Sequence, residues 1–286
     1  MTVTSTLWYL KRLPLYETTK PYVVNLPLSH VPTGQRTNQD CLAYSGIQIK
    51  DIRTVEEAPT LDRNGFELSG AIPLSLEYEE FRDPAKVREV YLENVKTALL
   101  EMTGAEQAHA LHLAIRRRHP SFPEKPRGNR EAETDQPVQG VHCDYTPLQA
   151  YNSLRTALGD EKANEIWHER RVEIIQVWRP IRGPVLDWPV GVCESTSVNK
   201  DVDLVPTDNV WSYSVSETYN VFHSPEHKWY FVSEQSPEDV LLFKGFDNAE
   251  RVSTFCPHAA FKLDGADDVT QMRESVECAV LLVYPK

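Results

Sequence analysis

The residues best suited to chemistry are His142 and Asp144, which lie two positions apart in the run Val-His-Cys-Asp-Tyr-Thr. On an extended strand, side chains two residues apart point to the same side, so this pair would present an imidazole and a carboxylate together. Two histidines and one carboxylate are the ligand set of non-heme iron(II) sites that leave other metal positions open. His258, in the run Phe-Cys-Pro-His-Ala-Ala-Phe, is the predicted third ligand. We therefore predict an iron(II) site formed by His142, Asp144 and His258.

Arg273 and Ser275 form a second pair two positions apart, near the C-terminal end of the sequence. On a strand they would share one face, so that a guanidinium and a hydroxyl could bind one carboxylate together. The run from Glu238 to Phe243 resembles the strand that precedes the distal histidine in double-stranded β-helix oxygenases, and His258 follows it. Arg273 and Ser275 would therefore suit the far carboxylate of 2-oxoglutarate, whose keto-acid end would chelate the metal.

Other histidines compete with His258. His223 and His227 flank Ser-Pro-Glu in an expected hairpin, and either could replace His258 as the third ligand. His109 and His112 lie three positions apart, and an alternating strand would point them to opposite faces, so no shared ligand role is expected. The choice of third ligand therefore stays open at this point, with His258 preferred.

The composition limits the classes of partner. The chain has 286 residues, 41% of them hydrophobic and 25% charged, and a formal net charge of -12. This charge argues against nucleic-acid binding, which needs clustered lysine and arginine at the phosphates. The one basic cluster joins Arg116-Arg117-Arg118 to Lys125 and Arg127. We interpret it as a solvated loop or as a contact for an acidic small molecule.

The cysteines and the N-terminal run indicate the compartment. Five cysteines without C-x-x-C spacing predict reduced thiols in a cytoplasmic protein rather than a disulfide framework. Trp8, Lys11 and Arg12 interrupt the only apolar stretch of the first fifteen residues, so neither a signal peptide nor a membrane span is expected. We therefore expect a small-molecule substrate, with neither nucleic acid nor a membrane as partner. One sequence does not indicate the oligomeric state.

Short strands are the elements expected to position the candidate residues. An Asp-Pro start and apolar residues at helical spacing predict a helix over 83–102, and a second helix is expected from 147 to about 170, with a break near Gly159. Runs of β-branched and aromatic residues between turn signals predict strands over 172–177, 190–193, 209–215, 228–232, 240–246 and 277–284. Such strands favour an antiparallel barrel or sandwich, and two helices packed outside it give an α+β fold.

The whole chain, 1–286, is predicted to form one domain. Residues 1–104 would supply scaffold strands and a helix, and about 105–286 would form the core. The polar run from Ser121 to Gln139 leads into the predicted strand of His142 and contains almost no large apolar residue. It therefore predicts a mobile surface loop at the entrance, which could act as a lid.

Six motifs in order give the chain a resemblance to a known family. The motifs are Val141-His-Cys-Asp-Tyr-Thr146, Val177-Trp-Arg-Pro-Ile181 with Gly183-Pro184 and Asp187, His227-Lys-Trp-Tyr230, Asp239-Val-Leu-Leu-Phe-Lys244, Pro257-His-Ala-Ala-Phe261 and Arg273-Glu-Ser-Val-Glu277. Together they resemble the fungal secondary-metabolite hydroxylase/desaturase family, which includes gibberellin desaturase and bacterial relatives linked to cephamycin methoxylation. The resemblance runs from about Trp8 to the end of the chain and is strongest after Val141.

The resemblance implies an iron(II)- and 2-oxoglutarate-dependent oxygenase with a double-stranded β-helix core, of the jelly-roll or cupin kind, flanked by helices. Such an enzyme would consume O2 and would hydroxylate, desaturate or oxidatively cyclise a small secondary metabolite. Gln176 stands where the family pattern has Asn, and its amide is the predicted further contact for 2-oxoglutarate. Trp178 would share a strand face with Gln176 and would line the pocket or pack in the core. Tyr145 and Arg182 are the other predicted substrate contacts, Arg182 for an acidic group.

Two rival functions fit parts of the same pattern. A metal-dependent hydrolase could use two histidines, one carboxylate and a bound water, but it would need no carboxylate anchor at Arg273. A non-catalytic module of the same fold could bind a small acid without turnover. Dependence on 2-oxoglutarate would separate the oxygenase from both rivals.

Overall fold

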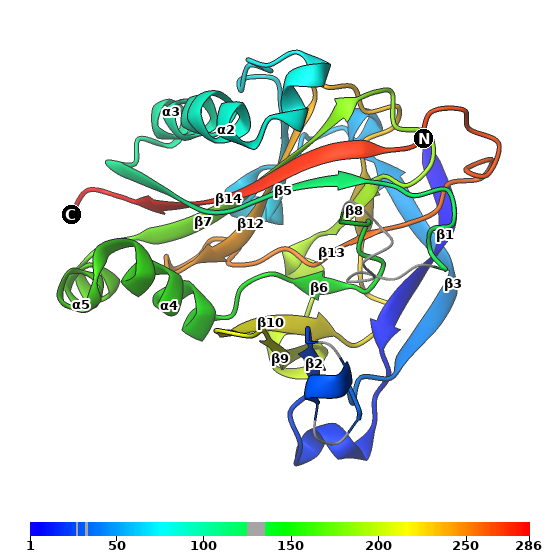
Figure 1. Ribbon diagram of the computed structural model, residues 1–286, viewed down its shortest axis with the longest axis horizontal. Coiled ribbons are helices and arrows are strands. Elements are labelled where there is room, and N and C mark those ends of the chain that lie inside the picture. Colours follow the sequence, from blue (N-terminus) through cyan, green and yellow to red (C-terminus); the bar gives the residue numbers. More distant parts are fainter. Residues whose placement is uncertain (27, 32–33, 125–134) are drawn as a thin grey trace.

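The computed structural model describes residues 1–26, 28–31, 34–124 and 135–286. Its strands form one sheet of nine strands and one of five (Figure 1). Buried side chains from both sheets meet in a shared core, where Trp178 and Phe243 of the smaller sheet pack with Val190 and Val192 of the larger. Helices cover the remaining faces of the smaller sheet, so the predicted α+β fold is confirmed.

The five-stranded sheet is antiparallel throughout. In spatial order it contains β4 (Phe66–Ser69), β12 (Val240–Asp247), β7 (Val172–Arg182), β14 (Glu274–Val283) and β5 (Gln107–Arg117). The central strand β7 is almost entirely buried because both of its faces are covered. Ile175 and Val177 pack outward beneath the first long helix, and Trp178 packs inward toward the larger sheet.

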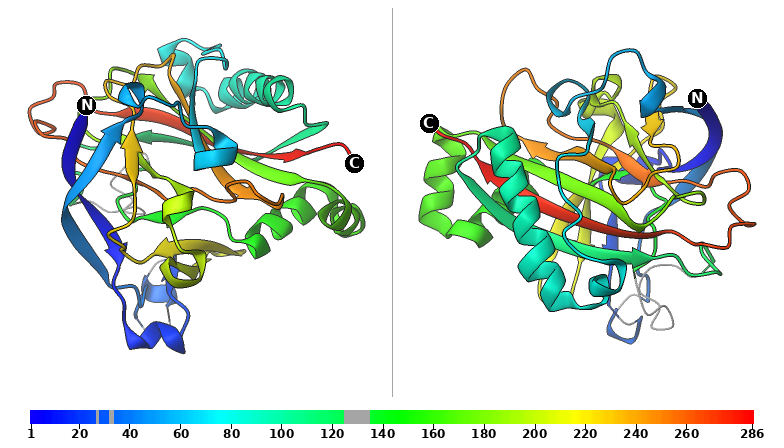
Figure 2. Two further views of the ribbon diagram at one scale, coloured as in Figure 1. Left: turned by 180° about the vertical axis from the view of Figure 1, so that it is seen from behind. Right: turned by 90° about the horizontal axis from the view of Figure 1, so that it is seen from above.

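The nine-stranded sheet combines strands from all parts of the chain. In spatial order it contains β1 (Thr2–Leu10), β3 (Cys41–Asp51), β11 (Trp229–Phe231), β8 (Val190–Cys193), β13 (His258–Ala260), β6 (His142–Cys143), β10 (Val215–Val221), β9 (Leu204–Val210) and β2 (Tyr22–Val24). The pairs β3–β11 and β2–β9 are parallel and the others antiparallel. Figure 2 shows β1 and β3 along one side of the molecule, so N-terminal strands extend the sheet that contains β6 and β13.

The first predicted helix forms on the outer face of the smaller sheet. It consists of α2 (Pro84–Lys86), a π-helical turn (Val87–Leu92) and α3 (Glu93–Thr103). The carboxylate of Asp83 accepts hydrogen bonds from the backbone N–H groups of Ala85 and Lys86, which caps the start. Gly104, with a φ of +72°, ends the helix in a left-handed conformation that favours glycine.

The second predicted helix is divided, as expected, at Gly159. The two parts are α4 (Pro147–Leu158) and α5 (Asp160–Glu169), and both pack against the inner face of the smaller sheet at its far end (Figure 1). The remaining helical segments are short: α1 (Leu61–Asn64), α6 (Lys200–Asp203) and 3₁₀ turns at Pro14–Glu17, Leu28–His30, Ile52–Thr54, Tyr78–Arg82 and Ser195–Ser197. Within the described parts of the chain, no helix has the length and apolar character needed to cross a membrane.

Most predicted strands are present, but one was misplaced. Residues 209–215 do not form one strand: they contain the end of β9, a turn and the start of β10. The backbone N–H of Trp211 donates to the carbonyl of Ser214 within that turn. β9 and β10 are rich in polar residues, so hydrophobicity did not reveal their bounds. Of the predicted lid over 121–139, residues 125–134 lie outside the described part of the chain.

Candidate metal site

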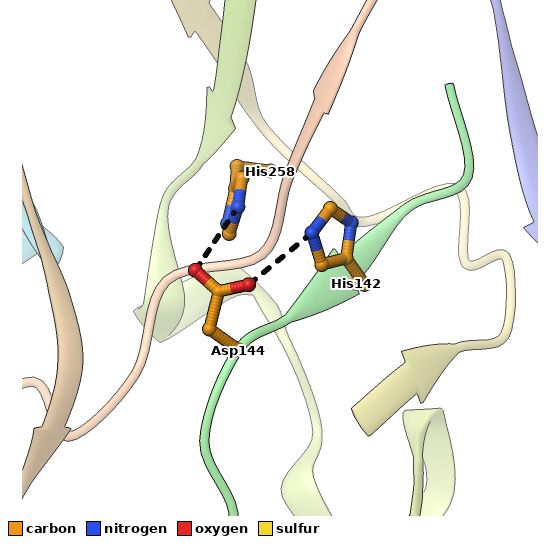
Figure 3. Close-up of side chains that lie close together, drawn as sticks. All are labelled: His142, Asp144 and His258. Carbon is orange, nitrogen blue, oxygen red and sulfur yellow. Dashed lines mark ion pairs between the residues drawn. The ribbon is translucent and has the colours of Figure 1, made fainter. Parts of the chain in front are cut away.

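The three predicted metal ligands lie close together, with the two imidazoles pointing to the carboxylate of Asp144 (Figure 3). Nε2 of His142 lies 3.4 Å from one oxygen of Asp144, and Nε2 of His258 lies 3.5 Å from the other. One ligand atom from each residue can be chosen so that all three lie within 4.8 Å of one another. This spacing allows one metal ion to contact both imidazoles and the carboxylate.

Strand pairing explains why these residues meet. β6 and β13 are neighbours, and His142 lies directly opposite His258 in their register. Asp144 follows β6 on the same side as His142, as the two-residue spacing predicts. Nδ1 of His142 lies 2.7 Å from the carbonyl oxygen of Gly140, and Nδ1 of His258 lies 3.1 Å from that of Cys256. Each Nδ1–H can donate there, which leaves each Nε2 free for a metal.

The electrostatics of two of the three candidate ligands suit metal binding, whereas Asp144 outweighs burial and raises the pKa of His142, whose proton a metal ion must displace. Burial, together with the nearby His142, lowers the pKa of His258 to about 4, so this imidazole is neutral near pH 7. Burial alone would raise the pKa of Asp144, but His258 and His142 outweigh it and lower that pKa. A neutral imidazole and an ionised carboxylate are the forms that bind a metal ion.

The competing histidines have other partners. His227 lies 3.3 Å from both the hydroxyl of Tyr9 and a carboxylate oxygen of Asp203. His223 stacks on Tyr44 with ring centroids 3.9 Å apart. Neither joins the cluster of His142, Asp144 and His258 among the described residues.

Arg273 lies in the same cavity as the three candidate ligands. Its side chain is buried, its Nη1 donates to the carbonyl of Trp188 at 2.7 Å, and its Nε and Nη2 lie 3.4 Å from Oγ of Ser275. The guanidinium lies 4.9 Å from the ring centre of Trp178. Burial, with the charge of Arg116 as the next cause, lowers the pKa of Arg273 to about 10.

No carboxylate in the described part of the chain forms an ion pair with the Arg273 side chain. A buried guanidinium without a counter-ion is costly, and it becomes favourable when an anion binds. The residues present therefore fit a carboxylate ligand at this end of the cavity. They fit a divalent metal ion at the other end, where the two histidines and Asp144 meet.

Gln176 is the third predicted contact for the cosubstrate. Its amide nitrogen lies 2.5 Å from a carboxylate oxygen of Asp144, so it holds a candidate metal ligand in place. Its side chain also lines the cavity, and the predicted contact with 2-oxoglutarate stays a prediction.

The three predicted substrate contacts lie outside the set of residues that line this cavity. Tyr145 is buried and packs with Ile174 and Phe246 below α4 and α5. Trp178 is buried in the core between the sheets. Arg182 is exposed at the end of β7, 3.8 Å from Glu274. Their roles toward a substrate stay predictions.

The basic cluster 116–118 is largely buried rather than solvated, and the sequence did not reveal its partners. Arg116 is buried beside Glu277 in the cavity, and Arg117 points to Glu274 at 2.8 Å. Nη1 of Arg118 lies 3.2 Å from the buried carboxylate of Asp187, which also accepts the backbone N–H of Arg273 at 2.8 Å. Strand alternation could have indicated this burial, because it places the side chains of Arg116 and Arg118 on the same face.

Comparisons with known proteins agree with this geometry. A family model described as an oxidoreductase/YMDC permease-like domain matches residues 7–283. Alpha-ketoglutarate-dependent dioxygenase tstK of Talaromyces stipitatus is 29% identical over 85% of this chain and 86% of its own length. Hydroxylase/desaturase efuI of Hormonema carpetanum is 31% identical, and the match covers 83% of each chain. Fe(II)/2-oxoglutarate-dependent dioxygenase nvfI of Aspergillus novofumigatus is 27% identical over 82% of each chain.

A solved structure extends the similarity to the fold. The iron and alpha-ketoglutarate-dependent endoperoxidase NvfI matches 100% of this chain and 99% of its own, with a TM-score of 0.83 at 25% sequence identity. The predicted double-stranded β-helix core is therefore confirmed. The family model matches most of the chain and a hydroxylase/desaturase is 31% identical to it, so the chain belongs to the hydroxylase/desaturase family of iron(II)- and 2-oxoglutarate-dependent oxygenases.

Proposed function

We propose that this protein binds iron(II) through His142, Asp144 and His258 and binds 2-oxoglutarate through Arg273 and Ser275. It is an iron(II)- and 2-oxoglutarate-dependent dioxygenase that uses O2 to hydroxylate, desaturate or oxidatively cyclise a small-molecule secondary metabolite. The observation that carries the proposal is a single cavity with two different ends. His142, Asp144 and His258 meet at one end, and the buried side chain of Arg273, which forms no ion pair with a carboxylate of the described residues, lies at the other.

Iron(II) and 2-oxoglutarate bound there supply oxygen activation coupled to decarboxylation of 2-oxoglutarate to succinate. The protein's part is to hold and orient. His142 and His258 present Nε2 atoms because backbone carbonyls accept from each Nδ1–H. Arg273 binds the far carboxylate in a buried setting where charge-assisted hydrogen bonds are strong. Val190 and Phe243 line the same cavity and help to exclude water from it.

The remaining assignments belong to the same proposal. Gln176 contacts the cosubstrate in addition to Asp144, and Tyr145, Trp178 and Arg182 influence where the substrate lies. The whole chain acts as one oxygenase domain in the cytoplasm, without nucleic-acid or membrane partners. A metal-dependent hydrolase is not favoured, because hydrolysis gives no role to a buried arginine without a counter-ion.

The test is an anaerobic titration of iron(II) and 2-oxoglutarate, followed by the weak visible charge-transfer band of their complex. We expect the band in the wild-type protein and a weaker band in Arg273→Ala at equal ligand concentration. Arg117→Ala is the matched control, because Arg117 neighbours the cavity strand but points to Glu274 outside it. Bound iron without any band on adding 2-oxoglutarate to the wild type would contradict the proposal.

A further inference from the structure

Arg116 is a second buried cation in the cavity, and the function proposed above gives it no role. Its Nη2 lies 2.5 Å from a carboxylate oxygen of Glu277, and its Nη1 donates to the carbonyl of Gln136 at 2.9 Å. Its side chain is 7% exposed, so water contributes little to its stabilisation. Arg116 and Glu277 both line the cavity that contains Arg273 and the candidate metal ligands.

The register of the smaller sheet places this guanidinium between the two ends of the cavity. On β14, Ser275 lies opposite Arg116 of β5 at the Arg273 end, and Ala279 lies opposite Gln176 of β7 at the metal end. Glu277 is midway between them on the same face, about 6.6 Å from each along the strand. Because Arg116 reaches along β14 to Glu277, its charge lies on the metal side of Ser275.

The charges around Arg116 agree with this position. Burial lowers the pKa of Arg116, but Glu277, Asp135 and Asp144 raise it, so the net shift is upward. Asp144 is the candidate metal ligand. The guanidinium of Arg116 therefore lies within electrostatic reach of the metal end of the cavity.

Arg116 makes the charged side chains of the cavity sum to zero. The cavity's side chains carry two positive charges, from Arg116 and Arg273, and two negative charges, from Asp144 and Glu277. Iron(II) and the dianion of 2-oxoglutarate also sum to zero. Without Arg116, Arg273 would be the one positive side chain beside Asp144 and Glu277, so the lining would carry a net charge of -1 where a dianion must bind, which is unfavourable in a buried site.

We propose that Arg116 binds the carboxylate of 2-oxoglutarate that adjoins the keto group, while Arg273 and Ser275 bind the far carboxylate. Glu277 and the carbonyl of Gln136 hold the guanidinium in place before the ligand binds. This inference rests on the proposed function, since it assigns a binding residue to the same cosubstrate.

The test compares two ligands that differ only at the far end. 2-Oxopentanoate keeps the keto acid of 2-oxoglutarate and has a methyl group in place of the far carboxylate. Dissociation constants for both ligands are measured anaerobically with iron(II), from the charge-transfer band, in the wild type, Arg116→Met and Arg273→Met. Losing one charge-assisted contact weakens binding by about 10- to 100-fold.

We expect Arg116→Met to weaken both ligands by that factor, because both carry the carboxylate next to the keto group. Arg273→Met should weaken 2-oxoglutarate alone. The control Arg117→Met should bind both ligands as the wild type does. If Arg116→Met binds 2-oxopentanoate with wild-type affinity, the inference is overturned while the proposed function stands. If the wild type shows no band with 2-oxoglutarate, the proposed function fails first.

Arg116→Met removes the main partner of the partly buried Glu277, which keeps only His112 at 3.8 Å, and this loss could unfold the protein. The double variant Arg116→Met with Glu277→Met removes both charges together, which buried ion pairs tolerate better than the loss of one partner. Its folding is checked by circular dichroism, and the same weakening of both ligands is expected. Wild-type affinity of the folded double variant for 2-oxopentanoate would also overturn the inference.

Discussion

Among the described residues, two clusters of three side chains have ligand atoms within 4.8 Å of one another. One is the candidate metal site of His142, Asp144 and His258. The other consists of Asp62, Glu173 and Asp247, where strands β7 and β12 meet α1. By distance alone, both clusters could hold a metal ion.

The difference is that the second cluster contains the buried ammonium of Lys244, with Arg171 beside it. The ammonium nitrogen of Lys244 lies 3.0 Å from Asp62 and 2.5 Å from Asp247, and it also forms an ion pair with Glu173. The chain thus supplies its own cation to the second cluster. At the first cluster, no lysine or arginine in the described part of the chain forms an ion pair with Asp144. Acidic groups that lie close together are therefore a weak indicator of a metal site. The informative feature is whether a lysine or arginine side chain already forms ion pairs with them.

The largest expected effect is at the first cluster. Asp144→Ala removes the only carboxylate of the candidate ligand set, so we expect loss of tight iron(II) binding and of substrate-stimulated succinate formation. Iron content after anaerobic loading and gel filtration is the measurement. Asp247→Ala is the matched comparison, because it removes an acid from the cluster that holds Lys244. Iron loading of Asp144→Ala at the wild-type level would contradict the ligand assignment.

The second cluster should respond in stability rather than in chemistry. Lys244→Met removes the buried ammonium from Glu173 and Asp247 and leaves Arg171, 2.7 Å from Asp247 and 3.8 Å from Glu173, as their remaining cation. Loss of one partner from a buried ion-pair network destabilises a protein by about 3–5 kcal/mol, and Arg171 places the expected loss toward the lower end. Urea unfolding measures this change. The folded fraction should bind iron(II) and 2-oxoglutarate as the wild type does. A variant as stable as the wild type would show that Lys244 does not compensate these acids.

Contacts between residues that lie close together in the sequence could be predicted from their spacing. His142 and Asp144 are two positions apart, as are Arg273 and Ser275, and each pair lies together in the structure. The i, i+2 rule needs only that the segment is extended, so it holds without knowledge of the fold. The ordered motifs then brought His258 to the same site.

The sequence could not predict contacts that depend on pairing distant strands. Arg116 meets Glu277 across 161 positions, through the register of β5 and β14. A shift in the same register also shows that His109 and His112 do not point to opposite faces of the strand, as was expected. They pair with residues 281 and 279, which are two apart on β14 and share a face. A bulge adds one residue to a strand and reverses its alternation, and the pattern of residue types did not mark it.

Gln176→Leu tests a residue that orients the candidate metal ligand Asp144 without being a ligand itself. The amide of Gln176 holds Asp144, and partners of metal ligands typically contribute about 10- to 100-fold to metal affinity. We therefore expect iron(II) affinity to fall by this factor, with the fold intact. Titration with iron(II) in the absence of 2-oxoglutarate is the measurement. If only the affinity for 2-oxoglutarate falls, Gln176 acts on the cosubstrate and not on Asp144.

The smallest expected effect is an alkaline loss of stability that comes from Lys244. Burial alone would lower its pKa, but Glu173 and Asp247 outweigh burial and raise it above the ordinary 10.5. The folded protein thus holds this proton more tightly than the unfolded chain. The resulting stabilisation is complete below pH 10.5 and is lost as the pH rises through the higher folded-state value, at about 1.4 kcal/mol per unit of pKa difference. Melting temperatures measured on both sides of that pH should fall more in the wild type than in Lys244→Met. Parallel curves for the two proteins would show that the second cluster does not depend on a charged lysine.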